Sequence, residues 1–346
     1  MKTDLMSMTP QMLASFCDGL ALPKFRTAQI YAWMHKFGVH DFSAMSNLPK
    51  ALRSRLEESC FIPYCQIEDK YVSRLDGTVK YLFRLYDGEY VETVVMHYKY
   101  GYTICVSSQV GCKMGCKFCA STLAGYKRNL LPGEIEGQIH AAQNDLGVRI
   151  SHIVMMGIGE PLDNYENVLT FLENVHDPNG LGISHRNITI STCGLVDKIL
   201  DLASRKLQIT LTVSLHAADN ETRNTIMPVN RKWPIEQVLD ACRKYYRTTS
   251  RRVSFEYTLI CGVNDSPAYA GKLAKLLQNM RAHVNLIPVN YVKENKFGQI
   301  HEETVKMFCQ ILQKHNINAT IRRTLGADIN ASCGQLRRMK NRGEQL

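Results

Sequence analysis

Short apolar runs alternate with segments of helical periodicity from residue 102 almost to the end of the chain. The runs predict six strands, at Tyr102–Val106, His152–Met156, Asn187–Ser191, Ile209–Leu215, Val253–Ile260 and Val284–Val289. After the first run, Ile135, Ile139, Ala142 and Leu146 fall on one face of a predicted helix that Gly147 ends. Consecutive β-α units of this kind predict an α/β fold with a parallel sheet, curved into a partial (β/α)6 barrel of the TIM type.

The pattern differs before residue 102. Residues 1–62 have helical periodicity, with helices opened by Pro23 and Pro49, and predict a small accessory domain. Its lysines and arginines are either a solvated face or a contact surface for a polyanion such as RNA, and the sequence does not choose between them. Lys80–Leu85 and Tyr90–Met96 alternate with period two around the turn Asp87-Gly88, which predicts a β-hairpin. We therefore expect a helical domain at 1–62, a hairpin extension at 63–100, and the barrel with a basic tail at 101–346.

Composition narrows the class of protein. No run of about 18 apolar residues is present, and the N-terminus lacks the features of a signal peptide, so we expect a cytoplasmic protein with no membrane contact. Twelve cysteines in 346 residues without secretory features suit a reducing compartment rather than a disulfide framework. The net charge of +10 favours a polyanionic partner such as nucleic acid.

Three cysteines stand together just after the first predicted strand. Cys112, Cys116 and Cys119 have the spacing C-x3-C-x2-C, which suits three irons of a [4Fe–4S] cluster and leaves the fourth iron open for a ligand. A structural zinc site needs a fourth ligand and usually a second C-x2-C pair, which the sequence lacks. The spacing resembles that of the radical SAM superfamily, whose open iron binds S-adenosylmethionine (SAM). The barrel is then expected to be a radical SAM barrel.

Polar residues and glycines follow other predicted strands at the rim where barrel active sites lie. They are Gly157–Pro161 after the second strand, Ser191–Gly194 after the third, Ser214–His216 after the fourth and Asn290 after the sixth. Taken singly, the glycines indicate a structural turn and His216 a hydrogen-bonded structural histidine. Their shared position at one rim favours a cofactor site.

Several segments resemble one branch of the superfamily, the adenine-C2 methyltransferases that act on both ribosomal and transfer RNA. The matching segments are 91–94, 105–112, 156–161, 214–217, 286–290 and 333–336. The resemblance runs from about residue 15 to the end of the chain. It implies methylation of C2 of one adenosine in 23S rRNA, at the peptidyl-transferase centre, and of one in tRNA next to the anticodon. It also implies SAM binding by Gly159, Glu160, Ser191, Ser214, Leu215, His216 and Asn290.

The resemblance implies three further roles and two SAM molecules per turnover. Cys333 takes a methyl group from the first SAM and, after hydrogen abstraction by the radical from the second, adds its methylene carbon to adenine C2. Glu92 accepts the C2 proton, and Cys105 releases the RNA through a transient disulfide with Cys333. Read in isolation, Cys105 is a buried core cysteine and Glu92 a surface carboxylate.

The expected partners follow from this chemistry. The target adenine must be unpaired or flipped to reach the rim, and Lys127-Arg128, Arg251-Arg252 and the basic tail are candidate phosphate contacts. An electron donor such as flavodoxin or ferredoxin is implied, and we expect a monomer. Two alternatives stay open: methylation of adenine C8 in the same rRNA, which confers antibiotic resistance, and a non-catalytic iron–sulfur sensor that binds RNA.

Overall fold

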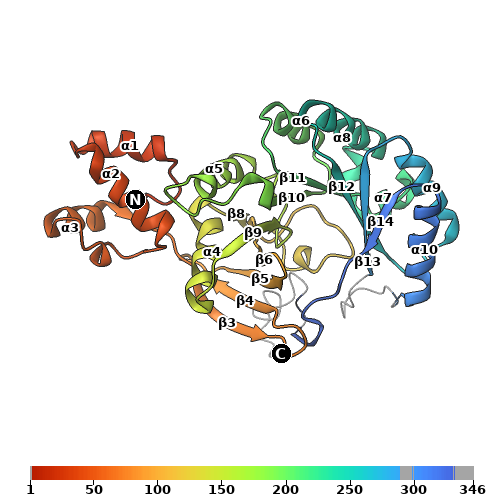
Figure 1. The fold of residues 1–346 in the computed structure, drawn as a ribbon, viewed down its shortest axis with the longest axis horizontal. Coiled ribbons are helices and arrows are strands. Elements are labelled where there is room, and N and C mark those ends of the chain that lie inside the picture. The colour runs from red at the N-terminus through yellow and green to blue at the C-terminus, as the bar shows by residue number, and fades with distance from the viewer. Residues whose placement is uncertain (1, 289–297, 299, 330, 332–346) are drawn as a thin grey trace.

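The structure is a computed structural model that describes residues 2–288, 298, 300–329 and 331. A ten-stranded sheet runs through it in the order β14-β13-β12-β11-β10-β9-β6-β5-β4-β3. The seven strands from β6 to β14 are mutually parallel, whereas β3, β4 and β5 add to β6 in antiparallel pairs. β3 and β14 end this order, so the barrel is partial (Figure 1).

The predicted strands and helices of the barrel are confirmed. Its strands are β6 (Gly101–Cys105), β9 (Ile150–Met155), β10 (Ile188–Thr192), β11 (Thr210–Ser214), β12 (Val253–Leu259) and β13 (Ala282–Pro288). Its helices are α4 (Pro132–Leu146), α5 (Tyr165–His176), α6 (Val196–Ser204), α8 (Ile235–Thr249), α9 (Pro267–Leu277) and α10 (Glu302–Lys314). Helices α6, α8, α9 and α10 lie along the outer side of the barrel (Figure 1).

Sequence reasoning missed three elements that complete the sheet or its rim. β14 (Asn318–Ile321) is a seventh parallel strand, although its short and mostly exposed segment indicated a basic tail. α7 (Asn220–Ile226) lies between β11 and α8. The predicted hairpin is present as β4 (Val79–Arg84) and β5 (Tyr90–Tyr98), and β3 (Gln66–Val72) pairs with it as an unpredicted third strand.

Some of the barrel strands, such as β10 and β12, are apolar on the outward face and polar on the inward face. In β10 the residues facing the helices are Ile188 and Ile190, while Thr189 lines the inside of the barrel. In β12 the outward residues are Val253, Phe255 and Tyr257, whereas Ser254 and Glu256 point inward. Parallel strands buried on both faces usually read as continuous apolar runs. The alternation therefore indicates that the inside of this barrel is a ligand cavity.

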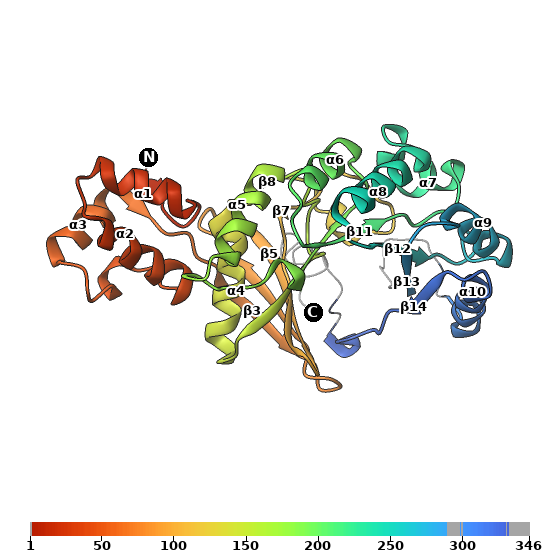
Figure 2. The ribbon, with the colours of Figure 1, turned by 45° about the horizontal axis from the view of Figure 1, so that its top comes forward.

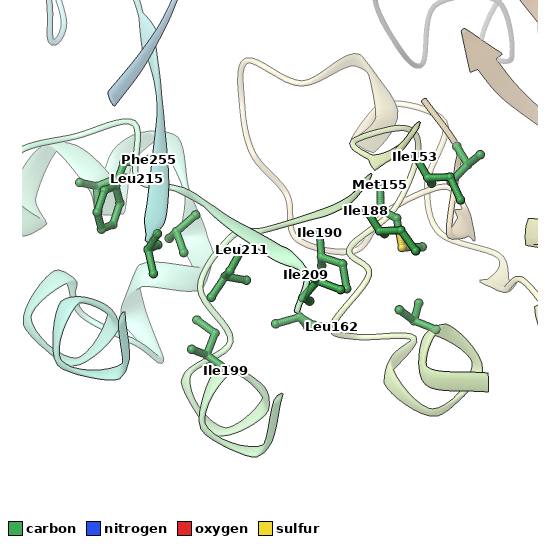
Figure 3. Packing of buried hydrophobic residues seen from close by; sticks show 14 of the residues in the cluster. Ile153, Met155, Leu162, Ile188, Ile190, Ile199, Ile209, Leu211, Leu215 and Phe255 are labelled. Carbon is green, nitrogen blue, oxygen red and sulfur yellow. The ribbon is translucent and has the colours of Figure 1, made fainter. Parts of the chain in front are cut away.

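The outward face forms the main core. Figure 3 shows Ile199 of α6 pointing toward Leu211 of β11, with Ile190 and Ile209 beside them. Each of these side chains is fully buried. Burying one such side chain contributes about 1.5–3 kcal/mol, so the helix layer holds the strands in register without using their inward face.

A helical unit with its own apolar core precedes the sheet. It contains α1 (Pro10–Gly19), α2 (Lys24–Tyr31), a π-helical turn at Ala32–Lys36 and α3 (Lys50–Ser59). The remaining short strands are β1 (Thr3–Asp4) and β2 (Cys60–Phe61), which pair here, and β7 (Gln109–Val110) with β8 (Arg128–Asn129) beside the barrel. Both views place the helical unit to one side, next to α4 and α5 (Figures 1 and 2).

A buried triad of one carboxylate and two histidines joins this unit to the barrel. The His35 Nδ1–H donates to both carboxylate oxygens of Glu136 at 2.9 and 3.0 Å, and His140 Nε2 contacts the same carboxylate at 3.2 Å. His35 comes from the π-helical turn and Glu136 from α4. Burial would raise the pKa of Glu136, but the charge of His35 and the hydrogen bonds from both histidines outweigh it and lower this pKa to about 2.

No helix in the described part of the chain is both long and apolar enough to cross a membrane.

The triad predicts a pH-dependent stability. We expect Glu136→Gln to lower the free energy of unfolding by about 3 kcal/mol near pH 7, because it leaves buried histidines without their carboxylate. The folded-state pKa of Glu136 lies below its ordinary value of 4.5, so its contribution is present above that value and is lost as pH falls toward about 2. In urea unfolding, the difference in the free energy of unfolding between the wild type and the variant should become smaller over that pH range. Glu58→Gln, at an exposed position, is the control; an equal effect of both substitutions would contradict the assignment.

Candidate active site

The inside of the barrel is a cavity of about 860 Å³. Its wall is made by inward residues of β5, β6 and β9 to β13, and Phe118, Cys119 and Ala120 of the cysteine loop close one end. That end is the rim where the parallel strands finish. The cavity therefore reaches the place where the sequence predicts the chemistry.

The cysteine loop begins at β7 and ends at a short 3-10 turn, Ala120–Thr122. Gly111 and Gly115 have φ values of +81° and +72°, a left-handed conformation that glycine adopts at little cost. The Lys117 N–H donates to the Ile226 carbonyl at 3.0 Å, which fixes the loop to the end of α7. Phe118 meets the ring of His216 edge-on at 4.8 Å between centroids. The loop is thus held over the rim by its backbone and by one aromatic contact.

The three thiols differ in their surroundings. Burial raises the pKa of Cys112 to about 12 and also raises the pKa of Cys119. The pKa of Cys116 is lowered, first by its contact with the Cys193 thiol and also by the charge of the Arg223 guanidinium. Thiols that burial keeps protonated ionise when they bind a cation, so the loop can take a positively charged metal cluster.

The donor set fits a cluster better than a single ion. Among the described residues, no three His, Cys, Asp or Glu side chains converge on one point that could hold a metal ion. In an iron–sulfur cluster each thiolate binds its own iron, so the sulfurs need not converge. The arrangement of Cys112, Cys116 and Cys119 is compatible with that requirement.

Gly157 and Gly159 allow the loop after β9 to lie against the segment 106–109. A Cβ on Gly157 would stand 2.6 Å from the Val106 carbonyl oxygen, and one on Gly159 would stand 2.7 Å from Ser108 Oγ. Gly159 also has a φ of +114°. The Glu160 N–H then donates to Gln109 Oε1 at 2.9 Å. The glycines are needed for this close approach, which places Glu160 inside the rim.

The Glu160 carboxylate is buried and held by neutral donors. Its Oε2 accepts from the N–H of Cys193 at 2.7 Å and from its thiol at 2.8 Å, and Oε1 accepts from the Leu162 N–H at 3.0 Å. Burial raises the pKa of Glu160, and these donors oppose the rise. A cation beside this carboxylate would offset the cost of burying its charge. Glu160 is therefore suited to an ammonium group.

Ser191, Ser214, Leu215 and His216 stand together at the ends of β10 and β11. His216 has a φ of +54°, its Nδ1 accepts from the Thr258 N–H at 2.9 Å, and its carbonyl accepts from Asn264 Nδ2 at 2.7 Å. Burial, with the charge of Arg223, lowers the pKa of His216 to about 3. The ring is neutral, and because Nδ1 accepts, the proton is on Nε2. His216 is thus both a structural histidine and a fixed donor at the rim.

Arg223 of α7 connects these segments and was missed from the sequence. Its Nη2 donates to the carbonyls of Cys193 at 2.7 Å and Ser214 at 3.1 Å, and its Nε donates to the Leu215 carbonyl at 3.0 Å. The side chain is fully buried. Arg223 stands in a run of polar residues after β11 and looks like a surface residue in the sequence. The groups that it hydrogen-bonds are backbone carbonyls, which leave no pattern in the sequence. Cys193 was seen only as part of its motif, and its contact with Glu160 depends on this geometry.

Glu92 and Cys105 lie on neighbouring strands. Val94 of β5 is opposite Cys105 of β6, and Glu92, two residues before Val94, points to the same face. Cys105 is buried and lines the cavity, so it is both a core and a cavity residue. Glu92 is fully buried and forms an ion pair with Lys80 Nζ at 3.0 Å. The interpretation of Glu92, taken alone, as a surface carboxylate is wrong. The side chain is buried, and Lys80 of the neighbouring strand β4 supplies a cation to it.

Two predicted site residues, Asn290 and Cys333, lie outside the described residues, as does most of the basic tail. No disulfide joins two of the cysteines that the structure describes. Of the candidate phosphate contacts, Arg128 is ion-paired with Asp87 and Glu134, each at 2.7 Å, and Arg251 donates to Thr210 Oγ1 at 3.3 Å. Lys127 is exposed, and Arg252 lies at the cavity opening opposite the cysteine loop.

Comparison with known proteins decides the family. The family described as the radical SAM superfamily matches residues 106–270, and the ribosomal RNA large subunit methyltransferase N-terminal domain matches residues 3–62. A protein named probable dual-specificity RNA methyltransferase RlmN, from Clostridium novyi, is 50% identical over 335 residues, covering 97% of this chain and 98% of that protein. A protein of the same name from Clostridium botulinum (strain Eklund 17B / Type B) is 52% identical over 314 residues, covering 91% and 90%.

This chain belongs to the RlmN family of radical SAM methyltransferases. A solved structure of a radical SAM methyltransferase from Sphaerobacter thermophilus matches it with a TM-score of 0.92 and 42% identity, covering 96% of this chain and 98% of the other. The predicted family, barrel class and methyltransferase class are confirmed. As in the rest of the superfamily, the cofactors are a [4Fe–4S] cluster and SAM, for which the cysteine loop and Glu160 provide fitting groups.

The close packing around Gly159 predicts that a larger residue at this position weakens SAM binding. We expect Gly159→Ala to lower the affinity for SAM at least tenfold, because both its φ and the contact with Ser108 and Gln109 oppose a Cβ. Equilibrium dialysis of the cluster-loaded protein measures this. Gly271→Ala in α9 is the control, since no atom lies within 4 Å of its Cβ and alanine favours a helix. Equal SAM binding by the wild type and both variants would show that the 157–159 loop tolerates the change.

Proposed function

We propose that this chain transfers a methyl group from SAM to C2 of an adenosine in 23S rRNA and in tRNA, with Cys333 as the carrier. One observation carries the proposal: Cys105, Phe118 and Cys119 line a single cavity. The buried Glu92 lies on the same face of the sheet as Cys105. Residues with such different roles in the proposed reaction come from separate strands, and the barrel brings them together. The names of the C. novyi and C. botulinum relatives support RNA of two kinds as the substrate.

The substrate explains why an ordinary displacement is insufficient. C2 of adenine lies between two ring nitrogens and is too electron-poor to attack a sulfonium methyl group. When bound, the cluster and SAM supply a carbon-centred radical. The protein must bind both cofactors, exclude water from the cavity, and bring the carrier sulfur and the adenine together.

Cofactor binding is assigned to the rim. Cys112, Cys116 and Cys119 hold the cluster, and Glu160 pairs with the ammonium of SAM, supported by its buried position among neutral donors. Gly159 lets the backbone approach the cofactor. The other residues assigned to SAM are Ser191, Ser214, Leu215, His216 and Asn290.

Proton removal is assigned to Glu92, which lies on the same sheet face as Cys105, and release is assigned to Cys105, which lines the cavity. Glu92 accepts the proton from C2, and its ion pair with Lys80 holds the carboxylate in one position. The release step requires that the radical adduct has already given up one electron, for which the iron–sulfur centre would be the acceptor. The Cys105 thiolate then attacks the sulfur of Cys333 and forms a disulfide with it. The sulfur–carbon bond to the RNA breaks, its electron pair passes to the carbon, and that carbon takes up a proton to become the methyl group. A dithiol reductant then restores both thiols.

We divide the chain into a helical unit up to residue 62, a hairpin extension up to residue 100 and the barrel. RNA contact is assigned in part to the helical unit. Phe25 and Phe37 are exposed on it and carry neighbouring cations, with Arg26 at 4.8 Å and Lys36 at 5.9 Å from the ring centroids. Exposed aromatic rings beside cations suit unpaired bases and phosphates. We also place the protein in the cytoplasm as a monomer reduced by flavodoxin or ferredoxin.

The product distinguishes this proposal from the C8 activity. Reconstituted protein with SAM, reductant and either unmodified 23S rRNA or tRNA should form 2-methyladenosine, measured by nucleoside mass spectrometry against both standards. Cys116→Ala should form none, because two thiolates cannot hold three irons. 8-Methyladenosine as the product would show that the chain methylates C8 of adenine instead of C2. Reductive cleavage of SAM without RNA methylation would contradict the proposed function.

Replacing the resolving cysteine should trap the RNA. We expect Cys105→Ala to accumulate a covalent protein–RNA conjugate that nuclease shortens, seen as a shift on a denaturing gel, with the linkage mapped to Cys333 by mass spectrometry. Cys309→Ala is the matched control, since Cys309 is 7% exposed and Cys105 5%, and Cys309 lies outside the cavity. Normal turnover of Cys105→Ala without a conjugate would assign release to another residue.

A further inference from the structure

A row of polar side chains in register links β11, β12, β13 and β14 across the sheet. Ser214 of β11 is in register with Glu256 of β12, Glu256 with Asn285 of β13, and Asn285 with Thr320 of β14. Glu256 and Asn285 line the cavity. Glu256 was not among the predicted site residues, because one glutamate among the alternating polar positions of a strand gives no sign of a ligand.

The hydrogen bonds in this row all run toward Glu256. Thr320 Oγ1 donates to Asn285 Oδ1 at 3.1 Å, and Asn285 Nδ2 donates to Glu256 Oε1 at 3.3 Å. Since the hydroxyl proton of Thr320 is used in this way, His283 Nε2, at 3.1 Å from Thr320 Oγ1, is the donor to it. The row fixes the orientation of the Asn285 amide and, through it, the orientation of the carboxylate.

The second oxygen of this carboxylate lacks a donor. Glu256 is 4% exposed, and Oε2 has no hydrogen-bond partner among the described residues. Leaving such a buried group without a partner is unfavourable, and more so when the group is charged. Burial raises the pKa of Glu256, while the charge of Arg322 and the contact with Asn285 oppose the rise. A buried acceptor that is fixed on one side and lacks a partner on the other is suited to a ligand that brings a donor.

The position of Glu256 identifies the ligand. Its backbone carbonyl accepts from the N–H groups of Leu215 and His216 at 3.1 and 3.3 Å, and Ser214 is its neighbour in register. These three residues are assigned to SAM above, and Glu160, which is assigned to the ammonium, lies across the rim near β10. The nucleoside end of SAM therefore extends toward β11 and β12. We propose that Glu256 accepts a hydrogen bond from the ribose hydroxyls of SAM through Oε2.

A carboxylate such as that of Glu256 is a suitable acceptor for ribose hydroxyls. A hydroxyl donates to a carboxylate without bringing a second charge, and acidic side chains bind ribose hydroxyls in other nucleotide sites. The inference rests on the proposed binding of SAM at this rim. It adds a residue that recognises the sugar rather than the methionine end of the cofactor.

The test is a double-mutant cycle on ligand binding, independent of turnover. S-adenosylhomocysteine and its 2′-deoxy and 3′-deoxy analogues are titrated by calorimetry into the cluster-loaded wild type and Glu256→Gln. Glu256→Gln keeps the shape and the contact with Asn285 but turns a donor toward the hydroxyls. We expect the variant to bind S-adenosylhomocysteine about 10- to 100-fold more weakly, and the penalty for at least one deoxy analogue to fall by a similar factor in the variant. Ser254→Ala, on the same strand and face, should bind like the wild type.

Each outcome decides the proposal. Cluster absorbance and thermal unfolding verify that Glu256→Gln is folded, and the penalty for the deoxy analogues in the wild type alone tests the contact without any substitution. Equal binding of the three ligands by the wild type overturns the proposal. So does normal ligand binding by Glu256→Gln with weakened RNA binding, which assigns the carboxylate to the target adenosine. If the wild type fails to bind S-adenosylhomocysteine at all, the proposed cofactor site fails, and the inference fails with it.

Discussion

The strands of the barrel pack their main apolar core on the outward face, whereas their inward face lines a cavity that carries many polar side chains. This constraint determines much of the rest of the structure. The helix layer buries residues such as Ile190, Leu211 and Phe255 and supplies the stabilising area. The inward face is then free to carry threonine, serine, asparagine and glutamate, whose polar groups need partners. A barrel of this kind is stable with a cavity in it because its core lies outside the cavity.

At the rim, the loops after the strands bury backbone carbonyls that the sheet does not hydrogen-bond, so these carbonyls need other donors. Arg223 satisfies three of them, from Cys193, Ser214 and Leu215. A guanidinium suits this task because its donors are fixed in one plane and point in several directions. The pKa of Cys116 is lowered first by its contact with Cys193 and then by this same charge. Arg223 therefore organises the rim and also helps to favour the thiolate form of a predicted cluster ligand.

The sequence was sufficient for features whose signal is local. Periodicity located the six predicted strands and their helices, and the spacing of Cys112, Cys116 and Cys119 located the loop. It was insufficient where a role depends on contacts between distant segments. Glu92 is buried because Lys80 faces it from the neighbouring strand. Arg223 and Glu256 are recognised by what they contact across the barrel. β14 was missed because an exposed edge strand of four residues has little apolar pattern.

The charges around the cavity are arranged unevenly. Of three buried carboxylates near it, Glu92 is paired with Lys80, whereas Glu160 and Glu256 contact only neutral donors at their described hydrogen bonds. Burying two acidic groups this way is unfavourable for the protein alone. SAM carries a sulfonium, an ammonium and two ribose hydroxyls. In the proposed cofactor site, the ammonium pairs with Glu160 and the ribose hydroxyls donate to Glu256, so the cofactor supplies the positive charge and the donors that these two carboxylates lack among the described residues.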